Sequence, residues 1–311
     1  MPIKLYIYPN ASDHVHDQIP KYQGVVPFSR EGIKRHCEVV TDPYAADYFY
    51  MGQVREDSTV PLFKATGDEF CFRSQYPDRH IADMEGESGW EIPSWLHDVK
   101  LSTMGALKKF NIPQLVSRPT FSTMMVDSVK DFREFSFPTR KGMGFKGCIN
   151  HPVRHRLMQA MELPALDECK VSREFYVNSG WAGSAPTGHP IHAEYEALML
   201  KHPLSLCPRG AGIDTTRTIE TCFYGRVPVI IADQDFHLVG EDKFDTGFCF
   251  KIIGDLSPSE IAIQLIRIYS QTSIDELRER GAQARKYFDT VIRRYFEDPT
   301  LYFLDSLKIT T

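Results

Sequence analysis

The segment from Pro203 to Ala232 limits the possible folds more than any other part of the chain. Its sequence predicts a strand over residues 204–207, a loop with two glycines, a helix over about 215–224 and a second strand over 227–232. A strand, a helix and a strand in this order form a βαβ unit. Because the two strands of such a unit run in the same direction, we expect a parallel sheet.

The loop of this unit favours contact with an anion. Gly210 and Gly212 carry no side chain, so backbone N–H groups there can approach a ligand closely. Asp214 is the predicted N-cap of the following helix, and Gly225 is the predicted residue just after its last turn. The N-terminal end of a helix is positive and attracts phosphate groups. We therefore expect an anion site at this edge of the sheet.

Charged side chains around the loop fit a nucleotide diphosphate. Arg209 in the loop and Arg217 in the first helical turn can bind phosphate oxygens through paired N–H groups. Glu220 lies three residues after Arg217 on the same helix face, where it can accept hydrogen bonds from a ribose. The alternative is an exposed Arg217–Glu220 pair, worth about 0.3 kcal/mol. The segment has no third glycine of a dinucleotide fingerprint and no P-loop motif.

Strands and helices alternate in both halves of the 311-residue chain, around a linker over residues 135–142. This pattern predicts an α/β fold of two Rossmann-like lobes that face each other across a cleft. We expect the first lobe to span residues 1–140 and the second residues 141–285. Residues 286–311 are expected to form a terminal helix that crosses back to the first lobe. Residues 67–97, rich in Asp, Glu, Trp and Pro, are predicted to be long functional loops.

Composition excludes several classes of protein. The net charge is −5, from 36 basic and 41 acidic residues, so a strongly basic nucleic-acid-binding protein is not expected. The seven cysteines are scattered and form no Cys-x-x-Cys pair, which is typical of reduced cysteines in a cytoplasmic protein. No apolar run approaches the ~20 residues of a membrane-spanning helix. We therefore expect a cytoplasmic protein.

Three motifs resemble, in order, those of exostosin-like glycosyltransferases. The most specific begins with Tyr195 and Leu198 and continues through Leu204-Ser-Leu-Cys-Pro-Arg-Gly210, Arg217-x-x-Glu220 and Gly225-Arg-Val-Pro-Val-Ile-Ile231. The run Thr41-Asp-Pro-Tyr-Ala-Ala-Asp-Tyr-Phe-Tyr50 is similar to a second element of the family. Phe145-Lys-Gly147 with Arg154-x-x-Leu157 is similar to a third.

The resemblance implies a GT-B fold and inverting transfer of a sugar from a nucleotide-diphosphate sugar to a glycan or another hydroxyl acceptor. UDP is the preferred nucleotide, and no metal or other cofactor is expected. The acceptor is assigned to the N-terminal lobe and the donor to the C-terminal lobe. Synthesis of a surface polysaccharide in the cytoplasm fits these features, with peripheral contact to the inner face of a membrane as an open alternative. The expected donor-binding residues are Arg154, Arg209, Gly210, Gly212, Thr215, Arg217 and Glu220.

An inverting transfer needs a base that takes the proton of the acceptor hydroxyl, and we expect this base in the N-terminal lobe. The candidates fall into two loops, in which a solvated polar surface is the alternative explanation. The first loop follows the predicted strand over residues 3–8 and is also open to a minority interpretation as a metal site. The candidates are Asp13, His14, His16 and Asp17 in the first loop, and Asp83, Glu85 and Glu87 in the second.

Two other functions stay open. Asp233-Gln-Asp235 mimics the Asp-x-Asp metal motif of GT-A transferases, although its position just after a predicted strand favours a turn. A metal-dependent GT-A enzyme would use Asp233 and Asp235. The other alternative is a protein of the same fold that binds a nucleotide sugar or a glycan without catalysis. A basic run from Arg278 to Arg294 either contacts an anionic surface or is a solvated helix face.

Overall fold

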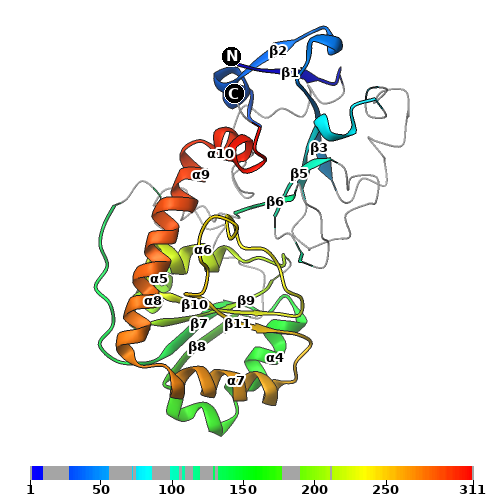
Figure 1. Cartoon of the computed structure of the whole chain (residues 1–311). Helices are drawn as coiled ribbons and strands as arrows, with labels where there is room; N and C mark the ends of the chain where they lie inside the picture. The colour runs from blue at the N-terminus through cyan, green and yellow to red at the C-terminus, as the bar shows by residue number, and fades with distance from the viewer. Residues whose placement is uncertain are drawn as a thin grey trace.

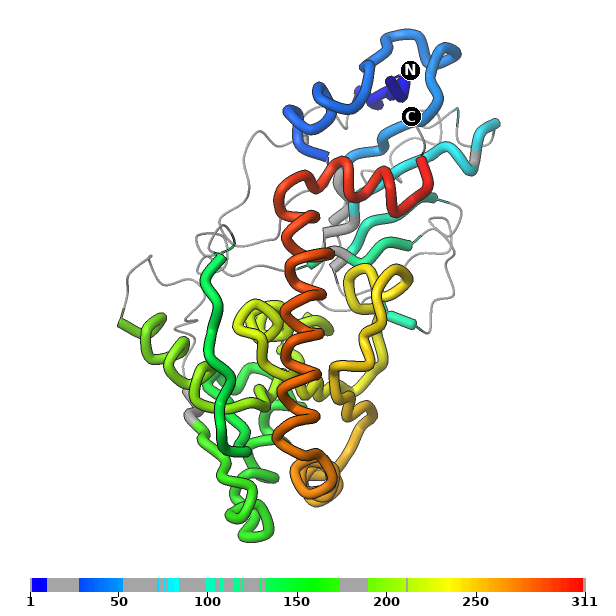
Figure 2. The backbone as a smooth tube through the Cα atoms, turned by 60° about the vertical axis from the view of Figure 1, so that its left-hand side comes forward, coloured from blue at the N-terminus to red at the C-terminus, as the bar shows by residue number. Residues whose placement is uncertain are grey.

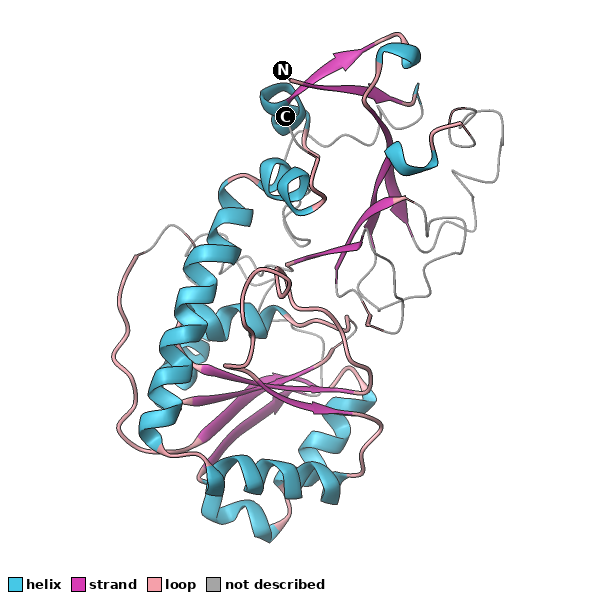
Figure 3. Cartoon of the chain, viewed as in Figure 1, coloured by secondary structure: helices cyan, strands magenta, loops and turns pink. Residues whose placement is uncertain are grey.

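Two separate parallel sheets organise the chain, and each has helices packed against it (Figures 1 and 3). The computed structural model describes residues 2–9, 28–55, 72, 75–85, 99–104, 107–108, 115–119, 129, 132–176, 190–210 and 212–309. The first sheet is six-stranded and the second five-stranded. The expected α/β fold with two Rossmann-like lobes is therefore confirmed.

The first sheet has the strand order β2-β1-β3-β4-β5-β6, and all of its recorded pairings are parallel. The strand order changes direction between β1 and β3, because β2 pairs with one edge of β1 and β3 pairs with the other edge. This sheet is formed by β1 (Ile3–Ile7), β2 (Cys37–Val40), β3 (Tyr48–Arg55), β4 (His80–Glu85), β5 (Lys100–Met104) and β6 (Leu115–Arg118).

The second sheet has the order β11-β10-β9-β7-β8 and is again parallel throughout its recorded pairings. Its direction changes between β7 and β9. In doubly wound sheets, ligands bind at such a switch point, outside the carboxyl ends of the strands. This sheet is formed by β7 (Met143–Cys148), β8 (Val171–Tyr176), β9 (Leu204–Pro208), β10 (Val227–Ala232) and β11 (Phe250–Ile253).

Helices cover both faces of the second sheet. On one face, α4 (Pro152–Met161) and α7 (Pro258–Gln271) bury apolar side chains against β7, β9 and β10. On the other face, α5 (Pro190–Lys201), α6 (Thr216–Phe223) and α8 (Ile274–Tyr287) form a second core. Strands β9 and β10 are buried along their whole length, as expected for strands packed on both sides. Short 3-10 helices lie at Pro43–Ala45, Pro77–Arg79 and Pro164–Cys169.

A helical segment runs from the second lobe to the first (Figure 2). It continues from α8 through a π-helical turn (Phe288–Ile292) into α9 (Arg293–Glu297), and then bends at Asp298 into α10 (Pro299–Ser306). Helix α10 packs against α2 (Arg30–His36) and places Phe303 and Leu304 in the core of the first sheet. Residues from the end of the chain thus complete the first lobe.

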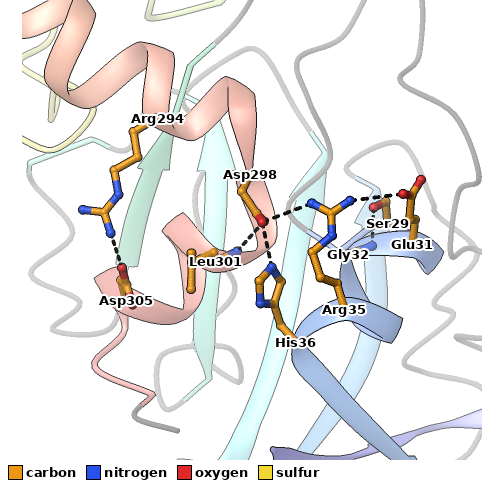
Figure 4. Close-up of polar contacts among 9 residues, drawn as sticks. All are labelled: Ser29, Glu31, Gly32, Arg35, His36, Arg294, Asp298, Leu301 and Asp305. Carbon is orange, nitrogen blue, oxygen red and sulfur yellow. Dashed lines mark hydrogen bonds and ion pairs between the residues drawn. The ribbon is translucent and has the colours of Figure 1, made fainter.

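A polar cluster joins α10 to α2 (Figure 4). The Asp298 carboxylate accepts a hydrogen bond from the backbone N–H of Leu301 at 3.0 Å, which caps α10. The same carboxylate contacts His36 Nε2 at 2.7 Å and Arg35 Nη1 at 3.3 Å. One side chain therefore caps the terminal helix and fastens it to the first lobe.

The basic helix is largely neutralised by its own neighbours. Acidic side chains three or four residues away, or on α10, form ion pairs with its arginines. This arrangement favours the solvated-face interpretation over contact with an anionic membrane. The pairs are Arg278–Asp275, Arg280–Glu276, Arg285–Asp289, Arg293–Asp289 and Arg294–Asp305.

The expectation for residues 67–97 is wrong in part. Residues 80–85 form β4, a central strand, rather than a loop. The polar residues His80 and Asp83 interrupt the apolar pattern, yet both side chains are fully buried. None of the helices within the described ranges is long and apolar enough to span a bilayer.

Candidate functional site

The loop and helix predicted from residues 203–232 form at the carboxyl edge of the second sheet. Strand β9 ends at Pro208, and α6 begins at Thr216. The predicted N-cap is wrong by one residue, because Thr215 occupies that position and makes no side-chain capping bond. Asp214 instead accepts a hydrogen bond from the Thr215 backbone N–H at 2.7 Å. Gly225 follows the helix with φ +62°, as predicted for a residue that ends a helix.

Three buried arginines gather at the switch point of this sheet. Arg154 comes from α4, which follows β7, whereas Arg209 follows β9 and Arg217 lies in the first turn of α6. Their exposed fractions are 8%, 5% and 7%. The structure therefore brings together the arginines that the sequence assigned to a phosphate site.

Arg154 ties the end of β7 to the end of β9. Its Nε donates to the carbonyl of Arg209 at 3.1 Å, and its Nη1 donates to the carbonyl of Cys148 at 3.0 Å. Gly210 lies against the same guanidinium, since a Cβ placed there would stand 2.8 Å from Arg154 Nη2. Gly210 leaves room for the Arg154 guanidinium, whereas the sequence suggested that the glycine lets the backbone approach a ligand.

The Arg217 guanidinium lies over two aromatic rings. Its guanidinium carbon lies 4.7 Å from the centre of the Phe145 ring and 4.8 Å from that of Tyr195. Its Nη2 donates to the carbonyl of Lys146. Its Nη1 is buried and has no hydrogen-bond partner within the described part of the chain. An unsatisfied buried donor of this kind is suited to a ligand oxygen.

Glu220 lies one turn further along α6 and is also buried, with 4% of its surface exposed. It accepts a hydrogen bond from the Tyr195 hydroxyl, with 2.6 Å between Tyr195 Oη and Glu220 Oε2. The alternative of an exposed Arg217–Glu220 pair is therefore wrong. The shared helix face was predicted correctly, but it points inward toward α5 and β7.

Burial shifts the pKa values of three groups near this edge of the sheet, and neighbouring arginines add to the shift of two of them. Burial, and then the charge of Arg217, lower the pKa of Arg154 to about 10. Burial, and then the charge of Arg209, lower the pKa of His151, the N-cap of α4. Burial raises the pKa of Asp214 to about 7, against a hydrogen bond from Thr215 that lowers it. Positive charge is crowded here, and a bound anion would relieve that repulsion.

The Asp-x-Asp residues are engaged by cations from two lobes. Asp233 Oδ1 accepts from Arg209 Nη1 at 2.6 Å. Asp235 pairs with Lys251 at 3.5 Å and with Lys108 of the first lobe at 3.6 Å. The segment follows β10 as a turn, as predicted. Within the described ranges, no group of three His, Cys, Asp or Glu side chains is arranged to hold a metal ion.

The candidate bases are placed only in part. Asp13, His14, His16, Asp17 and Glu87 lie outside the described residues. Asp83 is fully buried in β4 and is paired in register with Ser102 of β5. Glu85 is the last residue of β4, and only its backbone is described.

Two residues of the site are missing from the predicted donor-binding set. Tyr195 supports both Arg217 and Glu220. Lys146 is buried in β7, pairs with Glu194 at 2.6 Å and offers its carbonyl to Arg217. The sequence did offer a sign that Lys146 belongs to the site, because a lysine in the middle of a short apolar strand is unusual. Nothing in the local sequence pairs Tyr195 with Glu220, because they lie on different helices.

No protein-family model matches the sequence, and no curated protein matches it. Solved structures of similar fold include TarM, with a TM-score of 0.41 at 10% identity over 73% of this chain and 50% of that one. The chain thus spans about half the length of TarM. An alpha1,3-fucosyltransferase gives a TM-score of 0.40 at 11% identity, covering 99% of this chain and 90% of the other. A glycosyltransferase from Rickettsia africae ESF-5 gives 0.45 at 8% identity, covering 99% and 100%. These likenesses concern the fold alone.

The chain's own topology identifies the fold class. Two doubly wound parallel sheets lie in separate lobes, and a terminal helix returns from the second lobe to the first. This is the architecture of the GT-B fold.

Proposed function

We propose that this chain is an inverting, exostosin-like glycosyltransferase that moves a sugar from a nucleotide-diphosphate donor, preferably a UDP-sugar, to a hydroxyl acceptor. The proposed setting is the synthesis of a surface polysaccharide. The N-terminal lobe would bind the acceptor and the C-terminal lobe the donor. The observation that carries the proposal is the cluster of Arg154, Arg209 and Arg217 at the switch point of the second sheet.

The physical case begins with charge. Buried cations are unfavourable unless anions offset them. Within the described part of the chain, Arg209 pairs with the Asp233 carboxylate at 2.6 Å, whereas Arg154 and Arg217 donate to carbonyl oxygens and to the Cys148 sulfur. A diphosphate would supply the missing negative charge and would accept from the unpaired Arg217 Nη1.

The same geometry suits the departure of a nucleoside diphosphate. In an inverting transfer, the acceptor oxygen bonds to the sugar C1 while the bond from C1 to the phosphate oxygen breaks. The acceptor proton passes to a base in the N-terminal lobe. Negative charge grows on the leaving phosphate, and positioned arginines stabilise it. In this proposal Glu220, one turn beyond Arg217, accepts a hydrogen bond from the ribose.

Isothermal titration calorimetry with UDP and with GDP tests whether the site binds a nucleotide. We expect the wild-type chain to bind UDP and Arg217→Ala to lose that binding while its circular dichroism stays unchanged. The absence of binding of both nucleotides to the wild type would refute the site. Arg278→Ala is a matched control, because it removes an exposed arginine that pairs with Asp275.

Activity measurements distinguish the proposed enzyme from two alternatives. Donor hydrolysis or transfer distinguishes an enzyme from a binding protein of the same fold. The GT-B fold rules out a GT-A enzyme, and sensitivity to EDTA tests whether a metal-dependent transfer uses Asp233 and Asp235 on this fold. We expect activity to survive EDTA, because both carboxylates already pair with arginine or lysine.

A further inference from the structure

Tyr195 connects the two groups that the proposed donor site depends on. It lies on α5, the helix before β9, whereas Arg217 and Glu220 lie on α6, the helix after it. Both helices pack in the same core on one face of the second sheet. The Tyr195 ring lies beneath the Arg217 guanidinium, and its hydroxyl donates to Glu220.

We propose that Tyr195 is a positioning residue for nucleotide recognition: its hydroxyl orients Glu220 toward the ribose, and its ring holds Arg217 for the diphosphate. This inference rests on the proposed function of the same site. It adds a residue from a neighbouring helix to the donor-binding set and assigns separate roles to its two chemical parts.

The hydroxyl fixes a carboxylate that would otherwise rotate. A carboxylate has about four acceptor positions on its two oxygens, and Tyr195 uses one position on Oε2. Because both side chains are more than nine-tenths buried, this bond holds the Glu220 carboxylate in a defined direction. Burial raises the pKa of Tyr195 well above its ordinary value, so the phenol stays a donor at neutral pH.

The Tyr195 ring contacts Arg217, the residue proposed to bind the diphosphate rather than the ribose. The Arg217 guanidinium lies over the rings of both Tyr195 and Phe145, which limits the positions that it can take. Tyr195→Phe retains this contact and removes only the hydroxyl. Tyr195→Leu removes both. The two roles are therefore separable with a pair of variants.

The test uses three probes: UDP, 2′-deoxy-UDP and inorganic diphosphate, titrated into the full chain. We expect the wild type to prefer UDP over 2′-deoxy-UDP. Tyr195→Phe should lower the affinity for UDP about tenfold and abolish that preference, as expected for a lost hydrogen bond to a charged group. Its affinity for inorganic diphosphate should change less than about twofold, which also shows that the variant is folded. Tyr195→Leu should weaken the binding of all three probes.

Tyr287→Phe is the matched control. It removes another buried tyrosine hydroxyl in the same core, whose bond at 2.8 Å leads to the Val239 carbonyl and not to Glu220. Its preference for UDP should equal that of the wild type. If Tyr195→Phe behaves like Tyr287→Phe, or if the wild type binds both nucleotides equally, the positioning role is refuted while the diphosphate site stands. A wild type that binds none of the three probes refutes the proposed function itself, and the inference with it.

Discussion

Arg154 and Gly210 lie so close that even a methyl side chain at position 210 would collide with the guanidinium. A Cβ on Gly210 would stand 2.8 Å from Arg154 Nη2 and 3.2 Å from its guanidinium carbon. Arg154 has little freedom to move away, because its Nε and Nη1 are bonded to the carbonyls of Arg209 and Cys148. The glycine thus maintains the position of an arginine that comes from another part of the chain.

Gly210→Ala should displace Arg154 and weaken the binding of inorganic diphosphate about tenfold. The free energy of unfolding should fall by about 1 kcal/mol, the size of one strained or lost hydrogen bond. Calorimetry and urea unfolding measure the two effects. Gly247→Ala is the control, because its Cβ would meet only the Asp245 side chain, at 3.1 Å.

A double-mutant cycle identifies the cause. If Gly210→Ala acts through Arg154, it should have little further effect on diphosphate binding in an Arg154→Ala background. Additive losses would instead mean that the glycine contacts the ligand through its own backbone, as the sequence pattern alone suggested.

Arg217→Lys should weaken diphosphate binding tenfold or more, although it conserves the charge. Lysine is a point charge and lacks the planar group that lies over the rings of Phe145 and Tyr195. It also lacks the fork that reaches the Lys146 carbonyl and a ligand oxygen together. Titration with inorganic diphosphate measures the loss, and Arg278→Lys, at an exposed position of α8, provides the comparison. An unchanged affinity would show that charge alone is recognised.

The second lobe could be predicted well because its signals are local. Ser257 and Glu260, three residues apart, form both bonds of a capping box, and Ser273 caps α8 by accepting from the backbone N–H of Glu276. The apolar runs of β9 and β10 are buried on both sides. The first lobe was harder, because β4 carries His80 and Asp83, whose burial depends on strands and aromatic rings distant in sequence.

In the site, too, the features set by local sequence could be predicted and those set by packing could not. Helical spacing placed Arg217 and Glu220 on one face correctly. The direction of that face, and the partners Phe145 and Tyr195, follow from how α5, α6 and β7 pack together. The N-cap at Asp214 was wrong because local propensity cannot distinguish adjacent Asp and Thr residues at a helix start.

Folding stability should fall as the pH drops from about 6.5 toward 4, through His202. Burial, and then the charge of Lys201, lower the pKa of His202 to about 4, while an unfolded histidine has a pKa near 6.5. Between these values the unfolded chain binds more protons, so protonation favours unfolding. The ring cannot move outward easily, since it packs against Gly142 and Gly144 and bonds Ser172 at 2.7 Å.

Urea unfolding at pH 7.5 and pH 5 measures this effect in the wild type and in His202→Gln. The difference between their free energies of unfolding should change by about 2 kcal/mol between the two pH values. Other titrating groups cancel in this comparison. A difference that does not depend on pH would contradict the assignment.

Asp298→Ala should loosen the terminal helix from the first lobe and lower the free energy of unfolding by about 2 kcal/mol. The change removes the α10 cap, typically ~1 kcal/mol, together with the contacts to His36 and Arg35. Asp298→Asn should lose less, because asparagine also caps helices. Hydrogen exchange should increase in both α2 and α10. Asp305→Ala is the control, since Asp305 pairs with Arg294 and makes no recorded bond to α2 (Figure 4).

The Asp298 contact also weakens as the pH falls, but for a different reason from His202: the folded chain stabilises the charged form of Asp298 and the neutral form of His202. Partial burial alone would raise the pKa of Asp298, but hydrogen bonds from the Leu301 backbone and from His36 lower it below its usual range. A carboxylate with a depressed pKa stabilises the fold above its unfolded pKa of about 3.9, and this contribution is lost as the pH falls through its folded pKa. The difference between the wild type and Asp298→Ala should therefore persist down to about pH 4 and narrow below it. If instead the two chains converge while the pH is still above 5, the carboxylate is not what holds α10 against α2.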